Sequence, residues 1–175
     1  MSSLKYLSAY SPDLQQQITE LLDSNRLTDY LLQKYPLVNS VPNDNALREY
    51  VLELKNQYIK KSAPLSKVVF DKKIHVVENT LGLHSFVSRV QGGKLKSKNE
   101  IRISTLFKNA PIEFLNMIVV HELAHLKQKD HNKAFYQLCC HMLPNYHQIE
   151  FDVRVYLTHL EYKGEIYKNL SPNHQ

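Results

Sequence analysis

The sequence predicts an α+β fold in which helices flank a small antiparallel sheet. Three observations lead to this prediction: apolar residues recur at helical spacing in the first third, short strand-like segments follow Pro64, and helical spacing returns after residue 107. The length of 175 residues suits a single domain. We divide it into a helical part (1–62), antiparallel strands (63–106) and the remaining helices (107–175).

The composition, with 43% apolar and 22% charged residues, is that of a folded protein. No segment approaches the roughly 20 apolar residues that span a bilayer, and the first residues lack the apolar core of a signal peptide. We therefore expect a cytoplasmic protein without a membrane partner. The net charge of +5 is compatible with nucleic acid or nucleotide phosphates but does not require them. The adjacent Cys139 and Cys140 favour buried free thiols over a disulfide framework.

Three helices are predicted in the first third. Ser11 is suited to the N-cap and Pro12 to the first helical position, and the apolar residues that follow lie on one face. A second helix is expected over 29–34, ending before Pro36, and a third over 45–60.

Short segments rich in β-branched residues follow, separated by turn signals such as Gly92-Gly93. They are 67–70, 73–77, 83–90, 94–96 and 100–104. Connections this short predict antiparallel pairing.

Helices are again expected over 112–129, 132–142 and 148–160. The first is apolar over most of its circumference, which predicts that it is buried inside the domain. In the first half of the last segment, apolar residues also occur at every second position, so a strand is the other possibility there.

The stretch VVHELAHLKQKDH at 119–131 is where chemistry is expected. His121 and His125 are four residues apart, so on a helix both imidazoles point the same way and can hold one zinc ion. Glu122 can reach a water on that ion, which is the position of a general base. Two histidines and a glutamate in so apolar a helix would be costly without such partners.

A catalytic zinc site needs a third protein ligand and an open position. His131 is the favoured ligand, but only if the helix ends between 128 and 130 and the chain turns back. The HExxHxxxxxH spacing equals that of metzincins, although Gln128 stands where they have Gly. A downstream acid, Glu150 or Asp152, is the alternative ligand.

The run IVVHELAHLKQKDHNKAFYQLCCHM resembles the YgjP-like family of small bacterial zinc-dependent metallopeptidases, zincins related to the SprT and WLM groups. The resemblance extends to residues 73–104 and to the helical N-terminal third. It implies a zincin-like core with one zinc ion held by His121, His125 and His131, and Glu122 as the catalytic acid/base. Related groups act on proteins attached to DNA, and some close members are assigned a pyrophosphatase activity on UTP.

The favoured function is a zinc-dependent hydrolase of the metallopeptidase type, in which Glu122 activates the metal-bound water. An extended peptide would pair with an edge strand, for which 100–104 is the candidate. The residues considered for stabilising the oxyanion are Tyr136, Tyr146, His147 and Arg154.

Two other functions stay open. One is a zinc-dependent nucleoside triphosphate (UTP) pyrophosphatase, in which basic side chains offset the phosphate charge. The residues considered for that role are Lys94, Lys96, Lys98 and Arg102. The other is a nucleic-acid-associated module with a structural zinc held by four protein ligands.

Overall fold

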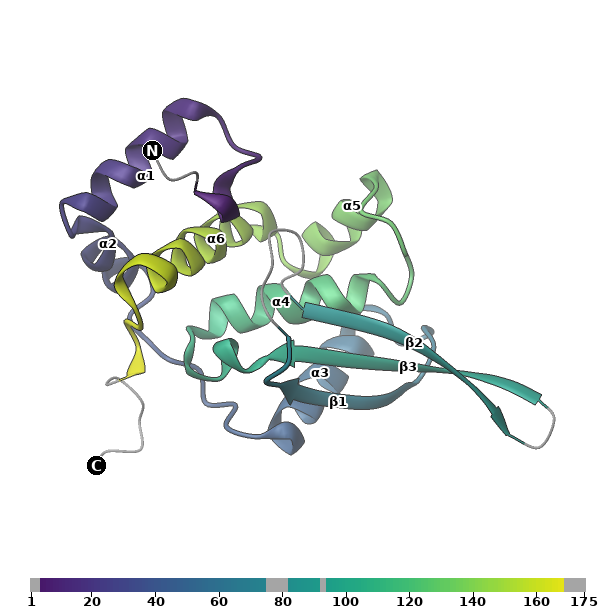
Figure 1. The fold of residues 1–175 in the computed structure, drawn as a ribbon. Helices are drawn as coiled ribbons and strands as arrows, with labels where there is room; N and C mark the ends of the chain where they lie inside the picture. The colour runs from purple at the N-terminus through teal and green to yellow at the C-terminus, as the bar shows by residue number, and fades with distance from the viewer. Residues whose placement is uncertain (1–3, 75–81, 92–93, 169–175) are drawn as a thin grey trace.

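A computed structural model describes residues 4–74, 82–91 and 94–168, with side chains for 4–74 and 99–168 (Figure 1). In this part of the chain, three helices precede a sheet and three follow it. The helices are α1 (Pro12–Asp23), α2 (Arg26–Lys34), α3 (Asp44–Tyr58), α4 (Ile112–Ala124), α5 (Lys133–Met142) and α6 (Tyr146–Lys163). The strands are β1 (Leu65–Asp71), β2 (Gly82–Gln91) and β3 (Lys94–Ser104), and short 3₁₀ helices cover Lys5–Leu7 and Thr105–Asn109. The prediction of mixed helix and sheet is confirmed.

β3 is the central strand of the sheet formed by the described residues, in the order β1-β3-β2. β2 and β3 form an antiparallel hairpin, with Gly82 opposite Ile103. β1 instead runs parallel to β3, with Val68 opposite Ile101. The prediction of a wholly antiparallel sheet over 63–106 is therefore wrong. It assumed that successive strands pair with each other, whereas the whole of β2 separates β1 from β3 and leaves enough chain for a parallel return.

The two strands predicted over 94–96 and 100–104 are one continuous strand, β3. Residues 75–77 of another predicted strand lie outside the described residues. Because β3 pairs with β1 on one side and β2 on the other over 100–103, the expectation that 100–104 is an edge strand is wrong. Beyond the start of β1 at Leu65, the hairpin of β2 and β3 continues away from the helices (Figure 1).

The helix boundaries follow their caps. The Ser11 side chain accepts a hydrogen bond from the backbone N–H of Leu14, and Pro12 opens α1 as predicted. The Asn43 side chain caps α3 in the same way, which starts that helix one residue earlier than predicted. α2 begins three residues earlier than expected, after Asn25 in the left-handed conformation. The segment predicted as 148–160 is a helix and not a strand.

α4 is buried on all sides, as its apolar circumference predicts. It contacts β2 and β3 of the sheet and also α3, α5 and α6. Every residue from Met117 to Ala124 is buried, including His121 and Glu122. Within the described residues, no helix has the length and apolar character needed to cross a membrane.

α6 connects α4 to the N-terminal helices. It packs against α4 and α5 on the core side and against α2 and the first 3₁₀ helix (Figure 1). Asp152 on α6 is fully buried and accepts hydrogen bonds from the Tyr35 hydroxyl at 2.5 Å and from the Lys34 ammonium at 2.7 Å. Tyr30 and Gln148 donate to the same carboxylate at 3.2 and 3.3 Å.

We expect Asp152→Asn to destabilise the fold by roughly 2–3 kcal/mol, because every partner of this carboxylate is a donor and the new amide nitrogen would face one of them. Urea unfolding at pH 7 measures the effect. Glu161→Gln is the matched control, since Glu161 pairs with Lys5 on the surface and its loss should leave the midpoint nearly unchanged. Equal midpoints for the two variants would show that the Asp152 network does not stabilise the fold.

Candidate metal centre

The turn after α4 brings His131 back toward the helix that it follows. α4 ends at Ala124, five residues before the end of the predicted range 112–129, and the backbone then closes into tighter turns. Lys127 and Gln128 both donate their N–H to the carbonyl of Ala124. The polar KQKD stretch offers little apolar surface to bury, so nothing favours a longer helix. The Asn132 side chain then caps α5 by accepting from the N–H of Phe135 at 2.9 Å.

The structure brings together the three histidines that the sequence singled out. The Nε2 atom of His131 lies 3.1 Å from Nε2 of His121 and 3.1 Å from Nε2 of His125. All three ligand nitrogens lie within 4.8 Å of one another. Two nitrogens on one tetrahedral zinc ion, at about 2.0–2.1 Å each, would lie about 3.3–3.4 Å apart, so the observed spacing fits such an ion closely.

The donor chemistry of this cluster also fits a cation. Nδ1 of His125 lies 3.0 Å from the carbonyl oxygen of Gln128, which can only accept, so Nδ1 carries the proton and Nε2 presents a lone pair. Nε2 of His131 carries at most one proton and cannot donate to both neighbours. A positive ion between the three nitrogens removes the resulting repulsion between lone pairs. Burial, together with the other two imidazoles, lowers the pKa of His121 to about 3, so its ring is neutral and available as a ligand.

Two residues that the sequence did not identify as supports hold these rings in place. The Phe135 ring lies 4.9, 4.7 and 4.8 Å from the rings of His121, His125 and His131, so one buried side chain packs against all three. The hydroxyl of Tyr146, fully buried at the start of α6, lies 2.7 Å from Nδ1 of His121. A hydrogen bond donated by this Nδ1 leaves Nε2 of His121 free for a metal.

Glu122 lies beside this cluster in an apolar setting. Its side chain is almost completely buried, and its Oε2 atom has no hydrogen-bond partner among the described residues. Burial raises the pKa of this carboxyl group to about 8. An unpartnered carboxylate oxygen in a protein interior is unfavourable unless a cation, a water or a substrate approaches it.

The alternative acidic ligands are engaged elsewhere. Asp152 is held by the tyrosines and lysine of α2 and its C-terminal flank. Glu150 forms an ion pair with Arg154 at 3.2 Å. Neither belongs to the cluster of metal-binding groups found among the described residues, whose only members are the three histidines.

The residues considered for stabilising an oxyanion or a phosphate differ in what they contact. Tyr146 is used in holding His121, and Arg154 pairs with Glu150. Arg102 forms ion pairs with Asp71 at 2.9 Å and with Glu100 at 3.2 Å. Tyr136 and His147 line a pocket beside the histidines. The side chains of Lys94, Lys96 and Lys98 lie outside the described residues.

Comparison with known proteins shows the family of this chain. The YgjP-like family, described as a metallopeptidase domain, matches residues 33–154. The chain belongs to the YgjP-like family. It is also 58% identical over 160 residues to a protein of Escherichia coli (strain K12) named UTP pyrophosphatase, an alignment that covers 91% of this chain and 96% of that protein.

No solved structure matches this YgjP-like chain significantly. The family and the histidine cluster together point to a metal-dependent hydrolase. That His121, His125 and His131 are its ligands, and that Glu122 is its base, stay predictions.

Tyr146→Phe should weaken zinc binding about 10- to 100-fold, because the ring still fills its buried site but no longer orients His121. The measurement is a competition titration with a zinc chelator on the purified protein. His131→Ala, which removes a ligand outright, should leave far less than the one zinc per chain expected of the wild type. Wild-type affinity in both variants would show that zinc, if bound, lies elsewhere.

In the metal-free protein, the contribution of Glu122 to stability should fall as the pH rises from about 5 to about 8. The folded-state pKa of Glu122 is raised to about 8 from an ordinary 4.5, so the folded protein binds one more proton in this window than the unfolded chain. Glu122→Gln lacks this proton and should be more stable than the wild type at pH 8 by a larger margin than at pH 5. Urea midpoints of both proteins at the two pH values test this, and a margin that does not grow with pH would contradict it.

Proposed function

We propose that this protein is a zinc-dependent hydrolase that splits UTP into UMP and pyrophosphate. The observation that supports a hydrolytic site is the convergence of the ring nitrogens of three histidines, together with the buried and unpartnered Oε2 of Glu122, the residue that follows His121 on α4. The substrate class follows from the relative named UTP pyrophosphatase, which shares 58% of its residues with nearly the whole of this chain.

Three imidazoles and an open position are the ligand set of a catalytic zinc site. His121, His125 and His131 would hold the ion. Zinc, when bound, supplies a Lewis acid that lowers the pKa of water and offsets negative charge on phosphate oxygens. The choice of zinc over other divalent metals rests on these ligands alone.

Glu122 is the base in this proposal. Its carboxylate accepts a proton from the attacking water, whose oxygen forms a bond to the α-phosphorus. The bond between this phosphorus and the bridging oxygen breaks, and the electron pair leaves with pyrophosphate. The positive charge of a divalent ion next to a buried carboxyl group favours its ionised form, so metal binding prepares Glu122 for this step.

A metallopeptidase is the second candidate, favoured by the description of the family and by one feature of the sheet. β2 is an edge strand that contacts α4, so an extended peptide could pair with it beside the histidines. Against this candidate, the strand first expected to receive a peptide, 100–104, is already paired on both sides.

Glu122→Gln should abolish UTP hydrolysis while leaving about one zinc per chain, because the amide keeps the shape of the site but cannot accept the proton. We expect a loss of at least about 10²-fold in kcat. Release of pyrophosphate from UTP, with metal content determined on the same samples, measures both.

The competing activity is tested with the same pair of proteins. Wild-type protein that cleaves unfolded protein substrates but not UTP, with cleavage lost in Glu122→Gln, would replace our proposal by the peptidase. Retained UTP turnover in the variant would remove Glu122 from the mechanism.

A further inference from the structure

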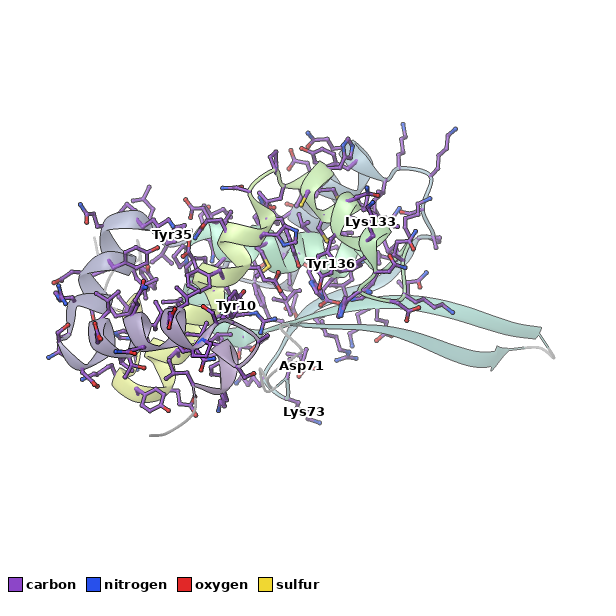
Figure 2. All side chains as sticks on the ribbon, turned by 90° about the horizontal axis from the view of Figure 1, so that it is seen from above. Tyr10, Tyr35, Asp71, Lys73, Lys133 and Tyr136 are labelled. Carbon is purple, nitrogen blue, oxygen red and sulfur yellow. The ribbon has the colours of Figure 1, made fainter. Side chains whose placement is uncertain are left out.

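Next to the histidine cluster lies a pocket that the proposed chemistry does not use. It is formed by one face of α5 and the start of α6. The residues that line this pocket, which we call the Tyr136 pocket, are Lys133, Tyr136, Gln137, Cys140 and His147. The first four recur at positions i, i+3, i+4 and i+7, so they form one stripe along α5. Figure 2 labels Lys133 and Tyr136 on this helix.

The pocket adjoins the metal centre through its aromatic wall. The ring of Tyr136 lies 6.3 Å from the ring of His131 and 5.2 Å from that of Phe135, which packs against all three histidines. His131 is the exposed member of the cluster, whereas His121 is buried. The Tyr136 pocket therefore adjoins the exposed member of the cluster.

The pocket combines aromatic surface with polar groups that are free to bind. The rings of Tyr136 and His147 lie 5.4 Å apart with their planes tilted by 37°, so together they offer a continuous surface for a flat ligand. Among the described side chains, neither Lys133 nor Gln137 has a hydrogen-bond or ion-pair partner. An aromatic platform with a free amide and a free ammonium group is suited to a nucleotide.

We propose that the Tyr136 pocket binds the uracil base of the substrate, an inference that rests on the proposed function. The base stacks on the rings of Tyr136 and His147. The Gln137 carboxamide accepts from the N3–H of uracil and donates to a neighbouring carbonyl oxygen of the base. A ribose separates the base from the α-phosphorus, so the base site must lie close to the histidines without overlapping them, and the ring of Tyr136 lies 6.3 Å from that of His131. Lys133, an exposed lysine that lines the pocket, pairs with a phosphate oxygen.

The two adjacent cysteines provide a direct test of occupancy. Cys140 lines the pocket, whereas Cys139 is fully buried and serves as an internal reference. In the zinc-loaded protein, saturating UMP should slow alkylation of Cys140 by iodoacetamide about tenfold, as followed by mass spectrometry. Ribose 5-phosphate, which has the phosphate but no base, should protect little. Equal protection by both compounds would show that the pocket recognises only the phosphate and would overturn the proposal.

Variants of the pocket separate base binding from catalysis. Tyr136→Leu and Gln137→Ala should each raise the KM for UTP about tenfold relative to the KM for inorganic tripolyphosphate, which has no base to stack. Gln137 is exposed on α5, so its replacement keeps the test informative if Tyr136→Leu does not fold. Tyr162→Leu, an exposed tyrosine of α6 outside the pocket, is the matched control and should leave the ratio of the two KM values unchanged.

The failure of this inference is distinguishable from failure of the proposed function. If the wild type hydrolyses UTP but UMP does not protect Cys140 and the KM ratio does not change, the base binds elsewhere and the pyrophosphatase proposal stands. If the wild type does not hydrolyse UTP, the proposed function fails. Protection by UMP that is lost in Tyr136→Leu would then still support a uridine nucleotide pocket, and its absence would overturn it.

Discussion

The convergence of three imidazole nitrogens on one point is the constraint around which this molecule is organised. Nε2 of His131 can reach the other two only because α4 stops at Ala124 and the chain folds back before α5 begins. The Asn132 cap fixes the start of α5 directly after His131. It thereby places Phe135 one turn farther on, where its ring meets all three histidines. The local chain geometry and the packing of the site are thus parts of a single arrangement.

The same burial that stabilises α4 also shifts the pKa values of two of its titratable groups, His121 and Glu122. α4 lies among the sheet, α3, α5 and α6, so desolvation keeps His121 neutral and disfavours the charged form of Glu122. A divalent ion reverses this preference for Glu122, because its positive charge is poorly screened in an apolar surrounding. α6 contributes at both ends: Tyr146 orients a histidine, and Asp152 ties the helix to the N-terminal part of the chain. The Asp152 network therefore links α2 to the helix that carries Tyr146.

The features set by local spacing could be predicted from the sequence. His121, Glu122 and His125 follow from the four-residue spacing on an apolar helix, and His131 from the polar stretch that lets the chain turn. The roles of Phe135 and Tyr146 depend on how α5 and α6 return over α4. The one sequence feature that hinted at the role of Phe135 was its position four residues after His131. The parallel pairing of β1 with β3 was missed for the same reason, since it joins strands separated by the whole of β2 and local pattern does not report such contacts.

The sheet and the pocket lead to different expectations about what the site accepts. A peptidase of this architecture needs a strand edge beside the metal, and the central position of β3 leaves the two edge strands, β1 and β2, of which β2 contacts α4. A nucleotide needs no strand at all. It needs a flat surface at the distance of a ribose from the metal and groups that meet its base and its phosphates. One stripe of α5, which begins two residues after His131, carries the aromatic ring, the amide and the ammonium group that the proposed base-binding pocket uses. The turn that completes the metal site therefore also positions the surface that would select its substrate.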